Sequence, residues 1–542
     1  MTTTADRDIS DVNKAPPTHR EIMIVLSGLL VGMFLAALDQ TVVSTAIRTI
    51  ADRLDGLTAQ AWVTTAYLVT STISTPLYGK LSDQYGRKPF YVFAIAVFVL
   101  GSVLCGIATN IYELAAYRAI QGIGAGGLLS LAFAIVGDLV PPRERGRYQG
   151  YFLAVFGTSS VLGPVIGGAL AGQQTLLGID GWRWIFFLNV PLGLLAMIAV
   201  VKRLSLPRRH SSAPIDYLGA ALLATTVVPI LLLAEKGREF GWGSPLSLGL
   251  LLLSVGSLVG FVLTERRLGE NAILPLRVFQ SNVFSLTSVT ALLVGAGMFG
   301  GLVVLPLYLQ IVRGASPTAA GLQLTPLMLG IFVTSSVSGM FMKRTGRYKP
   351  LPILGTATMF SALLLMTTLK VDTPLWHAMV FMLLMGMGLG LSMQTLVIAV
   401  QNALPPRDMG VATSSVTFFR SLGGTFGAAV SLAILFGSVT GNIQDRARNA
   451  GLPQAVIDRF GSASSLNDSS VIKTLPAAIQ RVVLEGFADS MSTVFLVVAL
   501  LLVPAFVLTL LTKEIPLRDK SGMQAADSAA DEARAKVDTT VV

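Results

Sequence analysis

Long apolar runs separated by short polar turns dominate the pattern of this sequence. Each run is about 20 residues long, which is the length that an α-helix needs to cross the hydrocarbon core of a membrane. The pattern predicts fourteen membrane-spanning helices, near residues 21–47, 60–79, 88–108, 111–137, 148–171, 183–203, 215–235, 246–265, 283–310, 318–342, 351–370, 375–400, 410–437 and 486–512. The predicted fold class is therefore an all-α polytopic membrane protein.

Both ends of the chain and one long loop depart from this pattern. Residues 1–20 and 513–542 are polar, and we expect them to form disordered cytoplasmic tails. Residues 438–485 are polar and of mixed charge, and they separate the last two predicted spans. A loop of that length predicts a small extracytoplasmic cap, with an amphipathic helix near 474–484.

The apolar runs also carry an internal repeat. A charged, glycine-containing turn at 79–88, GKLSDQYGRK, has a second copy at 339–349. The segment PPRERG at 141–146 returns as PPRDMG at 405–410, and the offset between copies stays between 260 and 264 residues. A repeat at a constant offset indicates a duplicated membrane body.

The repeat divides the chain into two halves of six spans each. It pairs spans one to six, residues 21–203, with spans nine to fourteen, residues 283–512. Spans seven and eight, within 204–282, are then an insertion between the halves. Repeats of this kind are typical of transporters in which two helix bundles rock about a central cavity.

Composition excludes several classes of protein. Apolar residues make up 53% of the 542 residues and charged residues only 13%, and mean hydropathy is +0.68, which leaves too little polar surface for a soluble protein of this size. The net charge of +10 does not indicate a nucleic-acid partner, because the Lys and Arg residues lie in short turns where they orient the chain and meet anionic lipid. Cys105 is the only cysteine, so an intramolecular disulfide is impossible.

The distribution of basic residues predicts the orientation. With the amino terminus taken as cytoplasmic, the outside turns contain only scattered basic residues, whereas the inside turns contain Lys80, Arg87, Lys88, Arg143, Arg145, Arg147, Lys202, Arg203, Arg208, Arg209, Arg266, Arg267, Arg277, Lys343, Arg344, Arg347, Lys349 and Arg407. The positive-inside rule then predicts an even number of spans and both termini in the cytoplasm. The expected location is the plasma membrane.

Two charged residues fall deep within predicted spans of the first half. Asp39 lies in the first span, where a carboxylate is costly, and burial would bring its protonation towards physiological pH. Arg118 lies in the fourth span and must find a partner, which makes it a candidate to tune the proton affinity of an acid. At the repeat offsets their places in the second half fall on apolar residues such as Met382. We interpret Asp39 and Arg118 as proton-coupling residues; the alternatives are a gate carboxylate and a structural arginine bonded to backbone carbonyls.

Small residues mark the fifth span. They are predicted to fill one face of the helix and consist of Gly157, Gly163, Gly167 and Gly168, with Pro164 among them. Small side chains let helices approach closely, and a proline removes a backbone hydrogen bond and permits a bend. The face is interpreted as a bending and packing surface, with plain close packing as the alternative.

The remaining sequence offers no other reactive site. It contains no phosphate-binding loop, no cluster of His and Cys with metal-ligand spacing and no nucleophile elbow, so neither an enzyme nor an ATP-driven pump is predicted. Four acids near predicted membrane edges are interpreted as interfacial: Glu265, Asp372, Glu485 and Asp489.

Several of these segments together resemble the major facilitator superfamily, and specifically its fourteen-span drug:proton antiporter branch. The segments that carry the resemblance are Gly79 to Lys88, Arg118 with Gln121 and Gly122, Gly157 to Gly168, Leu38 to Val43 and Trp182 to Pro191. The resemblance covers roughly residues 21–512. It implies two six-helix bundles with two inserted helices. Span thirteen differs from some members of the branch because it holds Arg420 where they have an acid, which argues against a divalent-cation substrate and a second proton site.

The resemblance also implies a cytoplasmic gate. In the family, the acid of the turn after span two reaches the amino end of the span that corresponds here to span thirteen, near Gly410. On this basis Asp83 is expected to bind there, and Arg87 to pair with Asp138. Gly79 and Gly86 belong to the same gate, and Lys343 replaces the acid in the second copy, so one such latch is expected. The alternative is that these charges only fix topology.

The expected function is proton-driven export of amphipathic organic compounds by alternating access. The expected partners are a small amphipathic substrate, protons and membrane lipid, without cofactor, metal or nucleic acid. The proton gradient supplies the energy, and a monomer is expected. Two alternatives remain: export of one endogenous lipid or metabolite, and a membrane sensor or scaffold that transports nothing.

Overall fold

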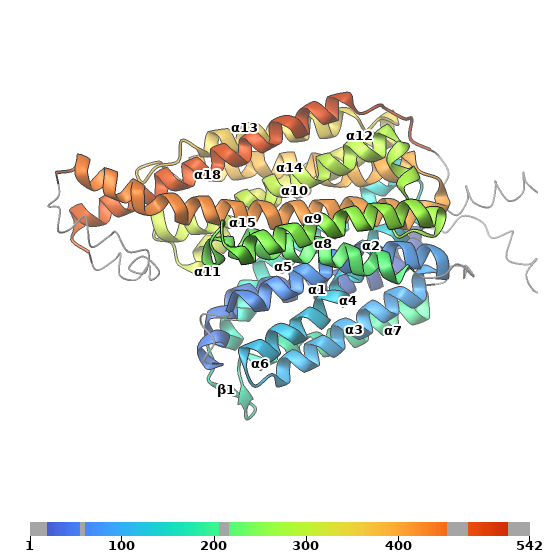
Figure 1. Ribbon diagram of the computed structural model, residues 1–542, viewed down its shortest axis with the longest axis horizontal. Helices are drawn as coiled ribbons and strands as arrows, with labels where there is room; N and C mark the ends of the chain where they lie inside the picture. The colour runs from blue at the N-terminus through green and yellow to red at the C-terminus, as the bar shows by residue number, and fades with distance from the viewer. Residues whose placement is uncertain (1–18, 55–59, 205–215, 452–474, 519–542) are drawn as a thin grey trace, which may run out of the picture.

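The computed structural model of the protein describes residues 19–54, 60–204, 216–451 and 475–518, and helices dominate all four segments (Figure 1). Twelve of the described helices are long and apolar enough to cross a membrane, and Pro350–Met366 is a shorter apolar helix. The helix Gln60–Tyr85 has the length of a span with a less apolar sequence. All fourteen predicted spans are therefore found as helices, and the predicted fold class is confirmed.

In its described residues, the first half contains seven helices and a small hairpin. Its elements are α1 (His19–Arg53), α2 (Gln60–Tyr85), α3 (Arg87–Ile107), α4 (Ile111–Leu139), α5 (Pro142–Ala171), β1 (Thr175–Leu176), β2 (Ile179–Asp180), α6 (Arg183–Phe187) and α7 (Asn189–Arg203). The antiparallel β1–β2 hairpin was not predicted from the sequence. Helices α6 and α7 together form the predicted sixth span, which is interrupted at Leu188.

The insertion and the second half follow. The insertion comprises α8 (Tyr217–Phe240), α9 (Pro245–Leu268) and the short helices η2 (Gly269–Asn271) and η3 (Leu276–Gln280). The second half comprises α10 (Asn282–Leu307), η4 (Tyr308–Val312), α11 (Pro317–Gln323), α12 (Thr325–Thr345), α13 (Pro350–Met366), α14 (Leu375–Ala403), η5 (Pro406–Asp408), α15 (Met409–Asn449) and α18 (Ala477–Leu511).

The internal repeat is visible in the helix packing. In the first half α1 packs on α5, and α2 and α3 pack on α4. The corresponding pairs occur in the second half, where α10 packs on α15, and α12 and α13 pack on α14. Helices α8 and α9 pack on each other, and α8 also touches α2 and α15. The inserted pair thus lies against one helix of each half.

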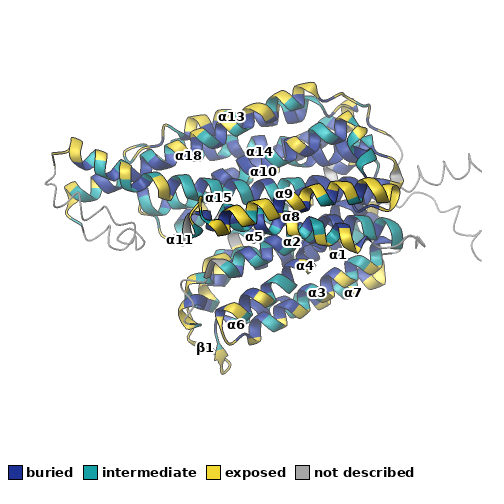
Figure 2. Ribbon diagram, in the orientation of Figure 1, coloured by how far each residue is buried: buried dark blue, intermediate teal, exposed yellow. Residues whose placement is uncertain are grey.

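The outer faces of the helices are apolar. Figure 2 shows exposed residues along the outward faces of helices such as α9 and α13. In α9 these residues include Leu252, Leu253 and Val259, and each has more than half of its surface exposed. Exposed apolar surface of this extent is unsuited to water, which is the expected property of a helix that faces lipid.

The turn at 79–88 is more compact than the sequence suggests. Helix α2 continues to Tyr85, and α3 begins at Arg87, so only Gly86 separates the two helices. Gly86 has a backbone φ of 99°, a conformation that residues other than glycine rarely adopt. One glycine is therefore sufficient to reverse the chain. We call this end of the molecule the inner end and the opposite end the outer end, following the predicted orientation.

The predicted extracytoplasmic cap requires a correction. Residues 438–449 continue α15, which is 41 residues long, and residues 477–485 form the start of α18 instead of a separate amphipathic helix. Arg446 joins the two extensions, because it binds Asp489 at 2.7 Å and Glu485 at 3.4 Å. Both helices project beyond their neighbours in Figure 1. Residues 452–474 lie outside the described part of the chain.

Candidate functional site

The two deep charges of the first half form an ion pair. Asp39 on α1 and Arg118 on α4 are both 1% exposed, and Arg118 Nη1 donates to Asp39 Oδ2. The same Nη1 atom donates to Gln121 Oε1 at 2.6 Å, and Nε donates to the carbonyl of Val63 at 3.4 Å. The ring of Tyr67 lies below the guanidinium, 4.0 Å from Cζ to the ring centroid. The arginine is thus held through its Nε and Nη1 atoms and the face of its guanidinium.

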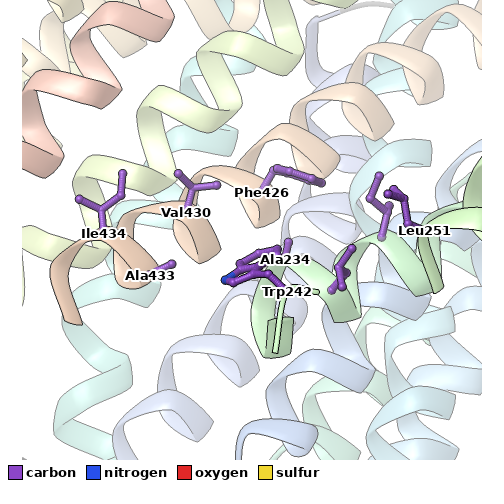
Figure 3. Close-up of a pocket in the computed structure, with 9 residues that line it drawn as sticks. Ala234, Trp242, Leu251, Phe426, Val430, Ala433 and Ile434 are labelled. Carbon is purple, nitrogen blue, oxygen red and sulfur yellow. The ribbon is translucent and has the colours of Figure 1, made fainter. Parts of the chain in front are cut away.

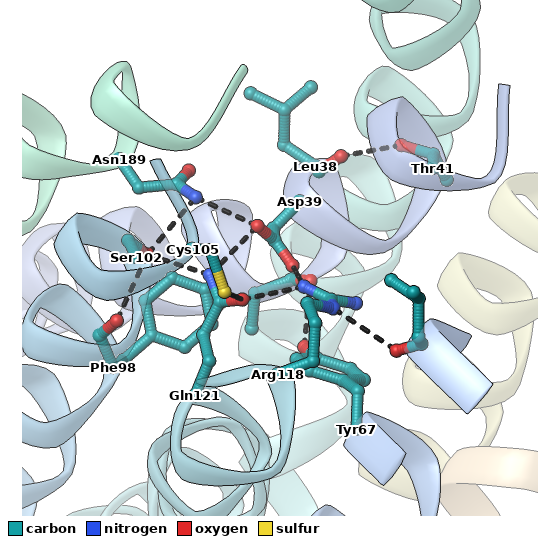
Figure 4. Close-up of polar contacts among 12 residues, drawn as sticks. Leu38, Asp39, Thr41, Tyr67, Phe98, Ser102, Cys105, Arg118, Gln121 and Asn189 are labelled. Atoms are coloured by element: carbon teal, nitrogen blue, oxygen red, sulfur yellow. Dashed lines mark hydrogen bonds and ion pairs between the residues drawn. The ribbon is translucent and has the colours of Figure 1, made fainter. Parts of the chain in front are cut away.

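Neutral polar side chains complete the surroundings of Asp39 (Figure 4). Its Oδ1 atom accepts hydrogen bonds from Gln121 Nε2 at 2.9 Å and from Asn189 Nδ2 at 2.8 Å. Ser102 lies behind both amides, with its Oγ 2.6 Å from Gln121 Nε2. Asp39 thus accepts three hydrogen bonds, two from side chains of α4 and one from α7.

Five helices meet at this network. They contribute Asp39 from α1, Tyr67 from α2, Ser102 from α3, Arg118 from α4 and Asn189 from the first position of α7. The break between α6 and α7 places Asn189 at a helix start within the protein interior, where it is 1% exposed. The network around Asp39 therefore connects most helices of the first half.

The predicted gate contacts at the inner end are confirmed. Asp83 Oδ1 accepts the N–H of Gly410 and Oδ2 accepts that of Val411, both at 2.9 Å. The amino end of α15 has free N–H groups, which favour an anion. Arg87 binds Asp83 at 2.6 Å and Asp138 at 2.8 Å. The three charged side chains tie α2, α3 and α4 to the second half; their role as a gate stays a prediction.

Close backbone contact accompanies the latch. A Cβ atom at Gly79 would collide with Ser414 of α15, so this glycine lets α2 and α15 touch directly. In the second copy of the turn, Lys343 and Arg347 are exposed, and Lys343 makes no hydrogen bond or ion pair with the described residues. The second half therefore has no counterpart of the Asp83 contact among the described residues.

A further bridge between the halves was missed by the sequence analysis. Arg145 is 1% exposed and donates from Nη1 to Gln401 Oε1 on α14 at 2.7 Å. Gln401 in turn donates to the carbonyl of Phe133 on α4 at 3.3 Å and to Thr413 at 2.8 Å. From the sequence, Arg145 is only one of many basic residues in the inside turns. An uncharged glutamine in an apolar run gives no signal that it faces a buried arginine.

The insertion contributes a surface cluster beside the latch. Lys80 of α2 donates to the carbonyl of Glu270 at 2.5 Å, and the Glu270 carboxylate lies 3.2 Å from Arg407. Arg277 binds Asp408 at 2.9 Å and lies 3.8 Å from Glu270. The segment after α9 thus touches the first half and the second half at once. The hydrogen bonds of Asp83, Arg145 and Gln401 that join the two halves lie at this inner end.

The small residues of span five divide between two faces, so the prediction of a single face is wrong. A Cβ atom at Gly163 would collide with Thr41, and one at Gly167 would lie 2.8 Å from the carbonyl of Val42. Gly157 and Gly168 have nothing within 4 Å of that position. Helix α5 continues through Pro164. Close packing on α1 therefore involves Gly163, which contacts Thr41, and Gly167, which contacts Val42. These two residues of α1 follow Asp39 by two and three positions.

One of the acids interpreted as interfacial is in fact buried. Glu265 is 0% exposed, and one of its carboxylate oxygens accepts the N–H of Leu274 at 3.0 Å, which folds the segment after α9 back on the helix. The other three acids form ion pairs near the outer end: Arg481 binds Asp372 at 2.6 Å and Glu485 at 3.0 Å, and Arg446 binds Asp489.

An apolar pocket lies where the inserted helices meet the second half (Figure 3). Its volume is about 410 Å³, and its walls come from α8, α9, the segment between them, and α15. The lining residues are Ile230, Leu233, Ala234, Trp242, Leu251, Phe426, Val430, Ala433 and Ile434. The lining residues carry no charge, so the pocket can accommodate an apolar group such as a hydrocarbon chain. The described residues hold no group of three or more metal-ligating side chains.

Comparison with protein-family models places these features in a known group. The model of the Major Facilitator Superfamily matches residues 29–428. The chain belongs to the major facilitator superfamily. It is therefore a multi-pass membrane transporter, as the repeat and the signature segments led us to expect.

Individual relatives extend along nearly the whole chain. An uncharacterized MFS-type transporter of Mycobacterium tuberculosis is 37% identical over 93% of this chain and 71% of its own length. The multidrug transporter protein MdtP of Bacillus subtilis is 34% identical over 92% of this chain and 94% of its own. Among solved structures, the proton:xylose symporter XylE superposes with a TM-score of 0.61 over 94% of this chain and 98% of its own, at 16% identity, which shows a shared fold.

Proposed function

We propose that this member of the superfamily is a proton-coupled antiporter of the plasma membrane, with both termini in the cytoplasm, that exports amphipathic organic compounds. The observation that carries the proposal is the buried carboxylate of Asp39, held by Arg118, Gln121 and Asn189. A buried ionisable group in a span is costly and is retained where it serves a function. The multidrug relatives from Bacillus subtilis support an amphipathic, drug-like substrate.

Proton binding would act through the donors of Asp39. Ionised Asp39 neutralises Arg118, and a buried arginine that loses its partner is strongly disfavoured. When Asp39 takes up a proton, the guanidinium must turn towards its remaining acceptors, Gln121 Oε1 and the Val63 carbonyl. This rearrangement changes how α1 sits against α4 and α7. The energy comes from the proton gradient, and no cofactor takes part.

The movement reaches the other half through α5. Thr41 is two residues beyond Asp39, and its Oγ1 donates to the carbonyl of Ser159 on α5 at 3.0 Å. Gly163 leaves no free space beside Thr41, so α1 and α5 move together. Helix α5 packs on α11 and α12 of the second half. Protonation of Asp39 is thereby coupled to the angle between the halves, while the Asp83 contact holds the inner end closed until the halves rock.

The test is pH-driven efflux measured in everted membrane vesicles. Wild-type protein is expected to accumulate a fluorescent amphipathic dye when the lumen is acidified, and a panel of anionic, neutral and cationic dyes covers the unknown substrate. Asp39→Asn should reduce this to background, because an amide cannot carry the proton. Asp52→Asn is the matched control, since Asp52 is an exposed acid on the same helix. Unimpaired efflux by Asp39→Asn would sink the proposal, and it would leave a scaffold or an uncoupled transporter.

A further inference from the structure

Arg420 lies in the middle of a second-half span, and it has no charged partner among the residues that the structure describes. It lies on α15, eleven residues beyond the start of that helix. Within the described part of the chain it makes no hydrogen bond or ion pair, and no acidic side chain lies close enough to offset its charge. The other deep arginines are engaged: Arg118 by Asp39, and Arg145 by Gln401 and two carbonyls.

The side chain of Arg420 keeps some accessible surface although it lies in the middle of a span. It is partly exposed, although the residues one turn away on the same face of α15 are buried. These neighbours are Val416, Thr417, Gly423 and Gly424. Helix α15 is also surrounded, because it contacts α2, α4, α8, α10, α14 and α18. An unpaired guanidinium that faced hydrocarbon would be very costly, so water or a ligand must occupy the space that it reaches.

The backbone below Arg420 is held firmly. Gly295 of α10 lies directly against the carbonyl of Arg420, and any Cβ atom there would collide with it. One turn on, Gly423 touches the backbone of Leu292, and Gly427 touches Ala296. Three glycine contacts thus lock α15 onto α10 around this position. A guanidinium on a fixed support is preorganised to receive a ligand.

The neighbouring exposed surface is apolar. Phe419 and Leu422 flank Arg420 on α15 and are partly buried against the core of the second half. Phe299 of α10 packs on Gly424, one turn away, and is also partly exposed. The surroundings therefore combine one positive charge with aromatic and aliphatic side chains. In the first half the charges of Asp39 and Arg118 cancel, whereas Arg420 has no acidic partner among the described residues.

From this combination we propose that Arg420 binds the anionic head group of an amphipathic substrate, such as a carboxylate, sulfonate or phosphate, while the body of the substrate rests on the apolar side chains. The proposal rests on the proposed transport function and adds the substrate class. The planar guanidinium presents paired N–H donors that match the oxygens of such groups. An amphipathic cation would meet repulsion at the same place, because charges interact strongly where water is scarce.

The test compares two ligands that share a naphthyl body and differ in charge. Naphthalenesulfonate and naphthyltrimethylammonium are titrated against the purified full chain in nanodiscs of zwitterionic lipid, at one pH and without a gradient. The wild type should bind the anion at least about tenfold more tightly than the cation, which corresponds to one charged contact. Arg420→Gln should abolish the difference, whereas Arg420→Lys should keep the preference at lower affinity.

The controls separate charge from folding and from the transport proposal. Arg344→Gln, at an exposed arginine near the inner end of α12, should leave both affinities unchanged. Equal affinities for the two ligands in the wild type, or an anion preference that survives in Arg420→Gln, would overturn the assignment. If Arg420→Gln does not fold, loss of the preference in Arg420→Lys overturns it as well. Because the measurement needs no proton gradient, it can succeed where the efflux test fails, and the reverse.

A final arm identifies the source of the anion. Nanodiscs that contain phosphatidylglycerol offer an anionic lipid head group at high local concentration. If lipid occupies the site, added phosphatidylglycerol should weaken naphthalenesulfonate binding to the wild type and have no effect on the residual binding to Arg420→Gln. If the site takes soluble organic anions only, the affinity for naphthalenesulfonate should be the same in both kinds of nanodisc. Either result supports an anion site at Arg420.

Discussion

The first half and the second half of the molecule pack corresponding helices in the same pairs, but they treat charge differently. In the first half, Asp39 and Arg118 neutralise each other among amide and hydroxyl groups. At the repeat offset from Arg118, the second half has Met382, which is 0% exposed and sits in an apolar core. The attraction within a buried ion pair offsets the free energy of desolvation only when the remaining donors and acceptors of both side chains are also hydrogen-bonded.

This difference separates the two proposed functions, proton coupling at Asp39 in the first half and anion binding at Arg420 in the second. Among the residues in the middle of spans that the structure describes, a buried carboxylate paired with an arginine is found in the first half, and a cation without an acidic partner is found in the second. Both halves pack corresponding helices in the same pairs, whereas our two proposals give each half its own ligand, a proton at Asp39 and an anion at Arg420. The predictions below test that division, beginning with the largest expected effect.

Arg118→Lys should strike the first half most strongly. Lysine has one ammonium group, so it cannot serve Asp39, Gln121 and the Val63 carbonyl together. The loss of two buried bonds to a charged group costs about 3 kcal/mol or more, and we expect efflux in everted vesicles to fall about a hundredfold. Met382→Leu, at the corresponding place in the second half, should retain transport. Similar losses in both variants would contradict the division between the halves.

Gly163→Leu should uncouple α1 from α5 in the same half. The new side chain would collide with Thr41, and overpacking of this kind costs about 1–3 kcal/mol. Membrane insertion should be normal, with efflux reduced about tenfold. Gly157→Leu is the matched control, because nothing lies within 4 Å of its Cβ position. Full transport by Gly163→Leu would show that this face of α5 does not need to follow α1.

Asp83→Asn should weaken the closed inner end. The amide replaces a charged acceptor of the Gly410 and Val411 N–H groups, at a cost of about 1.5 kcal/mol. A cysteine placed at Ser414, beneath Gly79, should then react with a water-soluble maleimide about tenfold faster. The native Cys105 is buried and gives little background. Lys343→Gln changes the corresponding position of the second half and should leave the labelling rate unchanged. Equal labelling rates in the wild type, Asp83→Asn and Lys343→Gln would mean that the charges of the latch only fix the topology of the chain.

Glu270→Gln should have the smallest effect. This side chain is 68% exposed, and surface ion pairs contribute about 0–1 kcal/mol. We therefore expect the labelling rate at the same cysteine to rise less than about fivefold, with the rise suppressed by high salt. A larger increase than that of Asp83→Asn would mean that the insertion, and not the repeat, controls the inner end.

Residues whose charge is exceptional for their place were predictable from the sequence. Asp39 and Arg118 stand out in apolar spans, and the repeat together with the family resemblance was sufficient to predict that Asp83 meets Gly410. The neutral partners were not predictable. The hydropathy of these partners is similar to that of other polar residues in spans. Only the fold shows that Gln121 and Asn189 reach Asp39 and that Gln401 reaches Arg145.

The extension of α15 was missed for a different physical reason. Its last turns are polar and of mixed charge, as in a loop between membrane spans. They remain helical because α18 extends alongside and supplies partners: Asn442 donates to Ser490 at 2.8 Å, and Arg446 binds Asp489. Such pairs join residues more than forty positions apart. Local sequence cannot distinguish two helices that support each other in water from a disordered linker.

The unbroken length of α15 makes it a mechanical lever. Its 41 residues span about 60 Å, roughly twice the thickness of the hydrocarbon core. The amino end receives Asp83, and the carboxyl end carries Arg446. A tilt about the inner end therefore displaces the far tip by about 1 Å for each degree, so a movement too small to resolve at the gate is amplified there. A distance probe on Arg448, an exposed residue of that tip, would therefore report movement of the inner end from the outer end.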